Sequence, residues 1–422
     1  MKILALPYGN SVAHVSRLLE IAKVLRARGH EIIFAGEGKC LDIVGHESFT
    51  VLELLDVPFE QIINAFRTTN FSLLYGNASE MEAYVQAELT LYQQIKPDLV
   101  LTDDRRTASI STAIANLPHI AVVNAHVTNY SQFPLLLPLL GSSVGYPLPA
   151  PLNTLLYQTQ VKIERQVYNT ALKGIQTVQR NYGLEPAFAY QVAQGKDLTL
   201  IADIPEFTPL HNPPQTFHYV GPITWQSSLP APQFLEQFKS YPKRAYLVLG
   251  SGGFKEFFKY LSVFERSDFA IAIAAGELVH EAPAHLPKNV FVERYINADL
   301  LLPHCDAIVC HGGNGTVYQA LRHGVPVIAI PFHNEQDYNA RRVQQLGLGK
   351  RLSHKRIWKD FSQVIATLEE VVNQSSYRQA AQAFQQQLNQ WNGPVRAADF
   401  IEAHFRECLR NPAMASRSFK SP

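Results

Sequence analysis

The chain has 422 residues, more than one hydrophobic core usually supports, so we expect two domains. Apolar residues make up 46% of it, which excludes a disordered protein, and 37 Lys and Arg nearly cancel 36 Asp and Glu, which argues against a nucleic-acid-binding surface. Its four cysteines have no CxxC spacing, which argues against a disulfide framework or a zinc site: Cys40, Cys305, Cys310 and Cys408.

The start of the chain predicts a βαβ unit. The apolar run Ile3–Leu6 reads as a strand and is too short for a signal peptide, and no later stretch is long and apolar enough to span a membrane, so we expect a cytoplasmic protein. Apolar residues recur on one face of a helix over Val15–Arg28, which Gly29 ends, and Glu31–Ala35 is the next strand. His14 stands where the loop meets the helix, and a lone histidine there is typically a capping or solvent-facing residue.

Two stretches of the first half carry no pattern that assigns them one role. Glu53–Glu88 is irregularly helical and rich in aromatic residues, and it either faces a binding site or belongs to the core. Asn129–Tyr157 is rich in Leu, Pro and Tyr with hardly a charge, so it packs on its own domain, lines a lipophilic site or touches a membrane surface. Helices over Val161–Asn181 and a strand at Leu198–Ala202 follow.

Two adjacent carboxylates follow a buried strand. Pro97–Thr102 is apolar and ends in Asp103 and Asp104, after which Thr107–Asn116 is helical and His119–Val123 is a strand. On its own, Asp103 is explained as an acid that stabilises the start of the following helix. The chain contains no Asp-x-Asp pair, the usual ligand pair for a metal-bound diphosphate, so we expect no dependence on a metal.

The run DAIVCHGGNGTVYQALRHGVPVIAIPFHNEQDYNARRVQQLGLG at 306–349 predicts a second βαβ unit. Ala307–Cys310 is a strand, GGNG a turn, Thr316–Arg322 a helix and Val325–Ile330 the next strand. The glycines let backbone approach a bulky anion, and the start of the helix offers N–H groups and a positive dipole end, an arrangement that holds phosphates. Taken alone, the same pattern is explained by a tight loop. Earlier strands of this half are predicted at Ala245–Leu249, Phe269–Ala274 and Val290–Glu293.

The run at 306–349 resembles the nucleotide-sugar signature of the GT-B glycosyltransferases of family 1, which include the UDP-glycosyltransferases and the macrolide and antibiotic glycosyltransferases. HGGNGT at 311–316 matches the diphosphate loop, GVP at 324–326 the next strand, and EQDYNA at 335–340 the end of the signature. The resemblance implies an α/β GT-B fold of two Rossmann-like domains that face across a cleft, with the C-terminal helix crossing back to the N-terminal domain. The boundaries that fit are an acceptor-binding domain at 1–223, a linker at 224–232, a nucleotide-sugar-binding domain at 233–395, the crossover helix at 396–410 and a disordered tail at 411–422.

The resemblance also implies site residues. His14 matches the general base that takes the proton from an acceptor hydroxyl, and Asp103 matches the carboxylate that orients it, with Asp104 as the rival. The donor-binding residues that it implies are Ser251, Tyr295, His311, Gly313, Asn314, Gly315, Thr316, Gln319, Glu335 and Gln336.

Four of these donor-site residues need comment. Gln319 replaces the Glu that grips both ribose hydroxyls in UDP-specific relatives, so its hydrogen bond to a ribose lacks the strength of a charged partner. Tyr295 either stacks on the base or packs at a strand end. Glu335 and Gln336 match the pair that hydrogen-bonds hydroxyls of the donor sugar, and a carboxylate beside an amide suits two adjacent hydroxyls.

The implied reaction is metal-independent, inverting transfer of a hexose, glucose in first place, from UDP-glucose to a hydroxyl of a lipophilic small molecule or lipid. The expected partners are the donor and a hydrophobic hydroxylated acceptor, with no further cofactor and no nucleic acid, and a peripheral membrane contact stays open. Two alternatives are a sugar-nucleotide epimerase, which needs no acceptor, and a non-catalytic lipid or pigment carrier. GGNGTVY lacks the third glycine of the dinucleotide fingerprint, which argues against an oxidoreductase.

Overall fold

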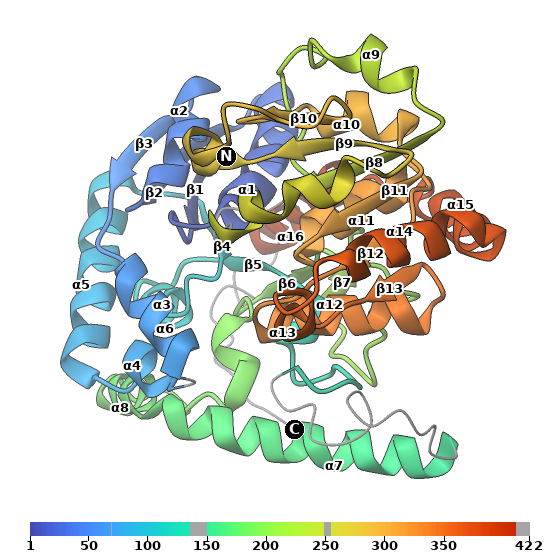
Figure 1. Ribbon diagram of the computed structural model, residues 1–422. Helices are drawn as coiled ribbons and strands as arrows, with labels where there is room; N and C mark the ends of the chain where they lie inside the picture. The colour runs from blue at the N-terminus through green and yellow to red at the C-terminus, as the bar shows by residue number, and fades with distance from the viewer. Residues whose placement is uncertain (69, 136–149, 249–254, 411–422) are drawn as a thin grey trace. The chain divides into compact units, whose positions relative to one another are not determined.

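The chain folds into two compact units, each with its own parallel sheet (Figure 1). The structure, a computed structural model, describes residues 1–422 except 69, 136–149, 249–254 and 411–422. The first unit comprises Met1–Trp225 and the segment from Trp391 onward, and the second is Gln226–Gln390. Each unit is described by itself below.

The described part of the first unit is built on seven parallel strands in the order β3-β2-β1-β4-β5-β6-β7. The strands are β1 (Lys2–Pro7), β2 (Glu31–Gly36), β3 (Thr50–Glu53), β4 (Leu99–Asp103), β5 (His119–Val123), β6 (Leu198–Ile201) and β7 (Phe217–Tyr219). The central strands are buried apolar runs, as expected where helices cover both faces of a parallel sheet. β1 and β4 lie side by side with Pro7 opposite Asp103, so both strands reach the same edge of the sheet together.

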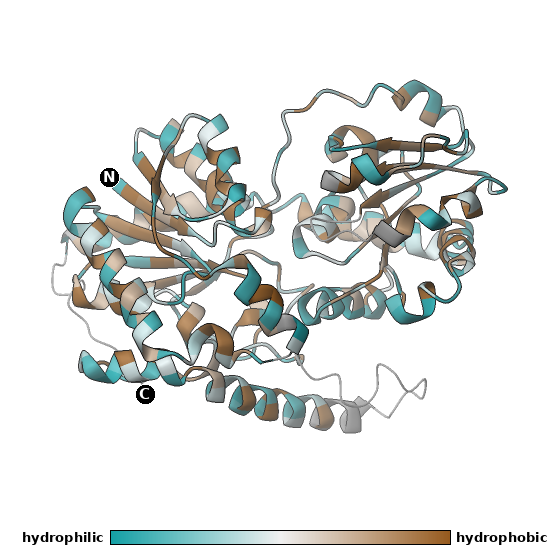
Figure 2. Ribbon diagram, turned by 60° about the vertical axis from the view of Figure 1, so that its left-hand side comes forward, coloured by the Kyte–Doolittle hydropathy of each residue, from teal (hydrophilic) through white to brown (hydrophobic). Residues whose placement is uncertain are grey.

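Helices cover both faces of this sheet. They are α1 (Val12–Ala27), α2 (Asp42–His46), α3 (Phe59–Thr68), α4 (Ser72–Tyr75), α5 (Ala78–Ile95), α6 (Ala108–Ile114), α7 (Ala150–Ala171), α8 (Lys173–Asn181) and α16 (Gly393–Arg410). Successive residues of β1 point into two different cores, since Ile3 packs with Leu18 of α1 while Leu4 packs with Leu91 of α5. Figure 2 shows the same division by colour, with hydrophobic residues along the strands and hydrophilic ones on outward helix faces.

The C-terminal helix α16 packs in the first unit. Its Ile401 belongs to the core that α1 forms with the sheet. At the edge of this contact, Arg28 pairs with Asp399 at 2.8 Å and His30 Nε2 lies 2.8 Å from a carboxylate oxygen of Glu402. The helix α16 is therefore fastened to α1, the helix that carries His14.

The described part of the second unit is built on six parallel strands in the order β10-β9-β8-β11-β12-β13. They are β8 (Lys243–Val248), β9 (Phe269–Ala274), β10 (Val290–Glu293), β11 (Ala307–Cys310), β12 (Val327–Ala329) and β13 (Gly349–Arg351). The helices are α9 (Leu235–Lys239), α10 (Ala298–Leu301), α11 (Asn314–Arg322), α12 (Asn334–Gln345), α13 (His354–Ile357), α14 (Ser362–Asn373) and α15 (Ser375–Leu388). The core packs strand residues such as Ile271 and Val309 against Phe264, Phe361 and Leu368.

Several elements differ from the predicted ones. β3 was not predicted, because its residues are largely exposed and show no buried run. The helical stretch predicted at 161–181 is two helices that begin earlier, at Ala150, and are separated at Leu172. The helices α14 and α15 are separated at Gln374, whose backbone is extended. Among the described helices, none combines the length and the apolarity needed to cross a bilayer.

Candidate active site

His14 lies in the first turn of α1, just past the carboxyl end of β1. The Tyr8 N–H donates to the Asp103 carbonyl at 3.0 Å, which ties the loop after β1 to the end of β4. Because the two strands are parallel neighbours, this loop and the residues after β4 share one edge of the sheet. The tertiary structure thus brings together side chains that are 89 positions apart in the chain.

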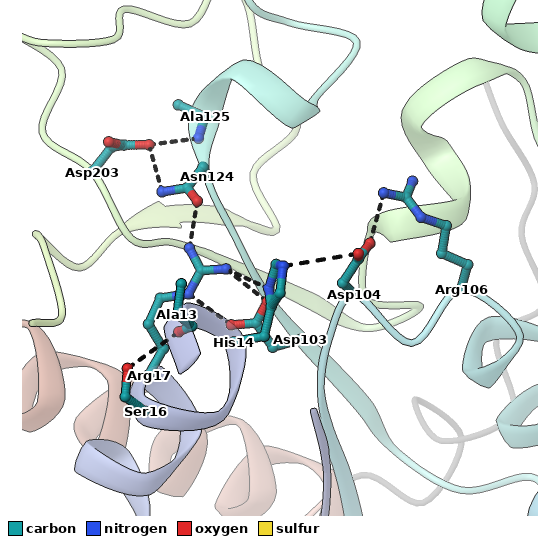
Figure 3. Close-up of polar contacts among 10 residues, drawn as sticks. All are labelled: Ala13, His14, Ser16, Arg17, Asp103, Asp104, Arg106, Asn124, Ala125 and Asp203. Carbon is teal, nitrogen blue, oxygen red and sulfur yellow. Dashed lines mark hydrogen bonds and ion pairs between the residues drawn. The ribbon is translucent and has the colours of Figure 1, made fainter. Parts of the chain in front are cut away.

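The His14 ring is held by a buried carboxylate. Its Nδ1 lies 2.6 Å from Oδ1 of Asp103, whose side chain is 1% exposed, whereas the His14 side chain is 24% exposed (Figure 3). Since an ionised carboxylate only accepts, the hydrogen is on Nδ1 and Nε2 is the acceptor nitrogen of the neutral ring. The pair therefore has the form of a base and the group that orients it.

Arg17 is the third member of this cluster, and the sequence analysis missed it. Its Nε and one terminal nitrogen donate to the two oxygens of Asp103, each at 2.7 Å, and that terminal nitrogen also lies 3.0 Å from His14 Nδ1. Arg17 is 6% exposed, so both charges of the pair are removed from water. The signal was present, since Arg17 is three residues after His14 and such residues share a helix face.

The remaining terminal nitrogen of Arg17 donates to Oδ1 of Asn124. Asn124 follows β5, and its NH2 donates to Asp203, which follows β6, at 3.3 Å. The same Asp203 oxygen accepts from the Ala125 N–H at 2.7 Å (Figure 3). Polar residues at the carboxyl ends of three neighbouring strands thus hold Arg17, and through it Asp103, in one position.

Asp104 points to a different side of the ring from Asp103. Its φ of 62° lies in the left-handed region, which turns the backbone sharply after β4 and which Asp tolerates better than most residues. One carboxylate oxygen lies 3.9 Å from His14 Nε2, and the other pairs with Arg106 at 2.6 Å (Figure 3). Between the two candidate carboxylates, Asp103 is the one bonded to Nδ1, and Asp104 stands near the nitrogen that would accept a proton.

The charges around His14 decide its protonation. Burial disfavours the charged ring, but the negative charge of Asp103, the hydrogen bond to it and the charge of Asp104 together outweigh burial. They raise the pKa of His14 above its ordinary value of 6.5. A higher pKa makes the ring a stronger base once it is neutral.

In the second unit, three glycines lie after β11. At two of them, other atoms of the chain leave no room for a side chain. Gly312 has a φ of 87°, and a Cβ there would lie 2.8 Å from the Gln336 carbonyl oxygen. A Cβ on Gly313 would lie 2.5 Å from Nε2 of His311. Gly315 differs, because nothing lies within 4 Å of the place where its Cβ would be. Of these glycines, Gly315 alone leaves open space.

The start of α11 is arranged to receive an anion. Gly313 is its N-cap and has no side chain with which to cap it, and the first turn, which carries Asn314, Gly315 and Thr316, contains no acidic residue. The helix has nine residues, so its dipole adds a positive field at this end. The open space at Gly315 lies at the same end, which is where a phosphate binds a helix.

His311 is neutral at physiological pH. Burial and the nearby His333 lower its pKa to about 4. Its Nδ1 is buried. A neutral ring adds no charge to the site. It could therefore help to hold a diphosphate only through one hydrogen bond and through steric fit.

The candidate sugar-binding residues lie in the first turn of α12. Asn339 of this helix donates to the Gly312 carbonyl at 2.9 Å, which fastens the glycine turn to α12. Oε1 of Gln336 accepts from the Phe332 N–H at 2.9 Å, so we expect Gln336 to contact a ligand through its NH2. Glu335 precedes it and is close enough to His311 to affect the pKa of that ring. These residues therefore form one group around the glycine turn.

Two further predicted residues of the second unit are Gln319 and Tyr295. Gln319 donates from its NH2 to Asp299 at 3.2 Å, which leaves Oε1 as the atom that can accept from a ribose hydroxyl. Tyr295 is 54% exposed and has the Arg294 guanidinium 5.3 Å from its ring, so it is not a core aromatic at a strand end. Ser251 lies outside the described residues. The described part of the chain contains no group of three or more His, Cys, Asp or Glu side chains suited to a metal.

Comparison with known proteins finds glycosyltransferases among the relatives of this chain. Residues 260–402 match the family model described as erythromycin biosynthesis protein CIII-like, C-terminal domain. Two relatives are 26% identical over 388 residues, 90% of this chain: a PGL/p-HBAD biosynthesis glycosyltransferase of Mycobacterium tuberculosis, covered to 87%, and a PGL/p-HBAD biosynthesis rhamnosyltransferase of Mycobacterium bovis, covered to 82%.

Solved structures agree on the fold. The spinosyn rhamnosyltransferase SpnG complexed with thymidine diphosphate is 17% identical, with a TM-score of 0.69 over 95% of this chain and 100% of that one. Together these matches confirm the resemblance to the macrolide and antibiotic glycosyltransferases and the α/β GT-B fold class. They support sugar transfer to a small-molecule acceptor as the chemistry.

Proposed function

From its kinship with the macrolide and antibiotic glycosyltransferases, we propose that this protein is a metal-independent, inverting glycosyltransferase that moves a hexose from UDP-glucose to a hydroxyl of a lipophilic small molecule or lipid. The observation that carries the proposal is the 2.6 Å hydrogen bond between His14 Nδ1 and Asp103 Oδ1. It presents Nε2 as a proton acceptor, which is what a general base for a hydroxyl needs. A carrier that only binds its ligand has no need of such a pair.

The proposed reaction is a single displacement. Nε2 of His14 takes the proton of the acceptor hydroxyl while the acceptor oxygen forms a bond to the anomeric carbon. The bond from that carbon to the diphosphate oxygen breaks, its electron pair leaves with the diphosphate, and the configuration at the carbon inverts. Asp103 stabilises the imidazolium that forms, and the N-terminal turn of α11 stabilises the departing diphosphate.

The donor assignment rests on the second unit. Glu335 and the NH2 of Gln336 suit adjacent hydroxyls of a glucose-like sugar, and Oε1 of Gln319 suits one ribose hydroxyl. A deoxyribose forfeits only one neutral hydrogen bond there, about 1 kcal/mol, so dTDP-sugars are the nearest competitors. The rhamnosyltransferase relative and the thymidine diphosphate complex make dTDP-rhamnose the competitor to test first.

The test combines binding and turnover. UDP-glucose, dTDP-glucose and dTDP-rhamnose are each titrated by calorimetry and then incubated with the protein, with and without a panel of lipophilic alcohols. We expect UDP-glucose to bind most tightly, nucleoside diphosphate to appear only when an alcohol is present, and proton NMR of the product to show inverted configuration. Tightest binding of dTDP-rhamnose would overturn the sugar and the base together.

The same experiment separates the alternatives. Conversion of UDP-glucose to an epimer without any alcohol would favour the epimerase. Binding of a lipophilic alcohol with no turnover of any donor would favour the carrier. A product with retained configuration would refute the single displacement while leaving sugar transfer in place.

A further inference from the structure

A row of three residues runs along one side of α11, away from the end that is arranged to receive an anion. Gly315, Gln319 and His323 are spaced four residues apart, so they follow one another along the same side of the helix. Nothing lies within 4 Å of the place where a Cβ of Gly315 would be. One helix turn rises about 5.4 Å, a distance that a nucleotide spans between its diphosphate and its ribose. A nucleotide whose diphosphate lies at Gly315 therefore brings its ribose to Gln319.

Asp299 lies beside this row and contacts two of its members. It belongs to the first turn of α10. Its Oδ2 accepts from the NH2 of Gln319 at 3.2 Å, and its Oδ1 lies 3.0 Å from Nε2 of His323. Because an ionised carboxylate only accepts, the hydrogen between Asp299 and His323 is on Nε2. His323 therefore holds one oxygen of Asp299, while the other oxygen is next to the Gln319 amide.

These contacts determine which atoms of the pair can accept from a ligand. The NH2 of Gln319 donates to Asp299, which leaves Oε1 as the accepting atom of Gln319. Oδ2 of Asp299 keeps accepting capacity, because a carboxylate oxygen has two lone pairs and this hydrogen bond uses one of them. The side chain of Asp299 is 40% exposed, so a ligand can reach it. Two acceptor oxygens, one neutral and one charged, are therefore next to the same amide group.

A structural role explains only part of this arrangement. A carboxylate in the first turn suits the start of α10, and its contact with His323 joins α10 to the end of α11. Neither of these roles needs an amide at position 319 or an exposed carboxylate oxygen beside it. Two neighbouring acceptors suit a ligand with two neighbouring hydroxyl donors, and the vicinal hydroxyls of a ribose are such a pair.

We propose that Asp299 determines donor specificity: its Oδ2 accepts a hydrogen bond from one ribose hydroxyl of the nucleotide, while Oε1 of Gln319 accepts from the other. Asp299 thereby supplies the negative charge that the neutral Gln319 lacks. The favoured nucleotides carry both ribose hydroxyls, since a deoxyribose leaves one of the two acceptors without a donor. This inference rests on the proposed function, because it takes the ligand at the start of α11 to be the nucleotide of the sugar donor.

Binding of three nucleoside diphosphates tests the inference without any turnover. UDP, 2′-deoxyuridine diphosphate and 3′-deoxyuridine diphosphate share the base and the diphosphate, and they differ only in the ribose hydroxyls. Measured by calorimetry, the weaker-binding deoxynucleotide should bind about tenfold or more weakly than UDP, as expected for the loss of a hydrogen bond to a charged acceptor. This comparison uses the unaltered protein and holds whatever the variants do.

Asp299→Asn should reduce that preference. The amide keeps the size of the side chain but offers at best a neutral oxygen, so the ratio of the two affinities should fall to about fivefold or less. The ratio is the quantity to compare, because the charge of Asp299 also repels a diphosphate and its loss can raise the affinity for both nucleotides. Asp299→Ala removes both oxygens and should lower the ratio in the same way.

Asp268→Asn is the matched control. Asp268 is an exposed aspartate of the same unit that directly precedes β9, so it lies at the opposite edge of the parallel sheet from the start of α11. The control makes the same change of charge and should keep the full preference for UDP. Thermal unfolding of each variant, measured beside the unaltered protein, shows that it is folded.

The outcomes separate the inference from the function on which it rests. If UDP binds no better than either deoxynucleotide, or if Asp299→Asn and Asp299→Ala keep the full preference, the role of Asp299 is refuted even when sugar transfer is observed. If the preference is present and depends on Asp299 but no nucleotide sugar supports transfer, the ribose site stands and the glycosyltransferase proposal fails. No binding of any of the three nucleotides would refute the ribose site and the UDP assignment together.

Discussion

Two histidines, one in each unit, face opposite electrostatic surroundings. His14 lies between two carboxylates that raise its pKa above 6.5 in spite of burial. His311 is buried beside another histidine, and its pKa falls to about 4. The same side chain is therefore prepared to gain a proton in the first unit and to remain neutral in the second.

The comparison shows that the surroundings of a histidine, and not the residue type alone, decide what it can do. His14 has an oriented ring, with Nδ1 bonded to Asp103 and Nε2 available as the acceptor nitrogen. His311 instead packs its Nε2 against Gly313. In the second unit, the positive field for an anion comes from the backbone of α11, not from a charged side chain.

The largest effect is expected from His14→Ala. Loss of the base should lower kcat by about a hundredfold or more, while the affinity for UDP-glucose stays unchanged because the proposed donor residues lie in the second unit. Single-turnover rates and calorimetry measure the two quantities separately. Near-normal transfer by this variant at neutral pH would rule out His14 as the base.

The second largest effect is expected from Asp103→Asn, which should change both the rate and its dependence on pH. Rate should fall by roughly a hundredfold or more, because the imidazolium loses its support. The pKa of His14 should also fall, because the negative charge of Asp103 is gone. Since the neutral ring is the active form, the rising limb of kcat/KM against pH should move to lower pH.

Asp104→Asn is the matched comparison for Asp103→Asn. Its oxygen is 3.9 Å from Nε2 and its side chain is 27% exposed, so solvent screens its charge and both effects should be smaller. A larger loss from Asp104→Asn than from Asp103→Asn would mean that the orienting carboxylate has been misassigned.

A smaller effect, confined to the donor side, is expected from Gly315→Ala. The added methyl enters the open space at the start of α11 and should weaken UDP-glucose binding by about 1–3 kcal/mol, as overpacking typically does. The free energy of unfolding should hold steady or rise slightly, because Ala is the better helix residue. Calorimetry and thermal unfolding measure the two.

Gly313→Ala is the counterpart of that variant within the same turn. Its Cβ would collide with the His311 ring, so the free energy of unfolding should fall by about 1–3 kcal/mol. Should Gly315→Ala destabilise the fold as Gly313→Ala does, or leave donor affinity untouched, the space at Gly315 is not the anion site.

The smallest effect is expected from removing metal ions. If the diphosphate charge is met by the start of α11, excess chelator should leave the initial rate of transfer unchanged. The measurement is the rate with and without chelator, followed by addition of magnesium or manganese. A strict requirement for either ion would contradict the mechanism.

Local patterns in the chain predicted the glycine turn of the second unit's candidate site, while Gln319, Glu335 and Gln336 came from the resemblance. The strand, glycine turn and helix at 307–322 follow from residues that are close in sequence, and the structure has them as β11 and α11. The glycines themselves were interpreted too simply, since two of them make room for the chain's own atoms and one leaves open space. Which atoms approach a glycine depends on packing between elements, and periodicity carries no information about it.

The sequence by itself predicted most of the central strands of both sheets and the helices α1, α6 and α11, because apolar periodicity and glycine or proline punctuation act over a few residues. It also determined that His14 and Asp103 belong to one site, through resemblance. Only the tertiary structure decided how that site is built. The parallel register of β1 and β4 brings His14 and Asp103 together, and the left-handed turn at Asp104 separates the two carboxylates. Arg17, from the next turn of α1, donates hydrogen bonds to Asp103. These are contacts between distant segments, and the free energy that selects them comes from packing the whole unit, not from any one stretch of chain.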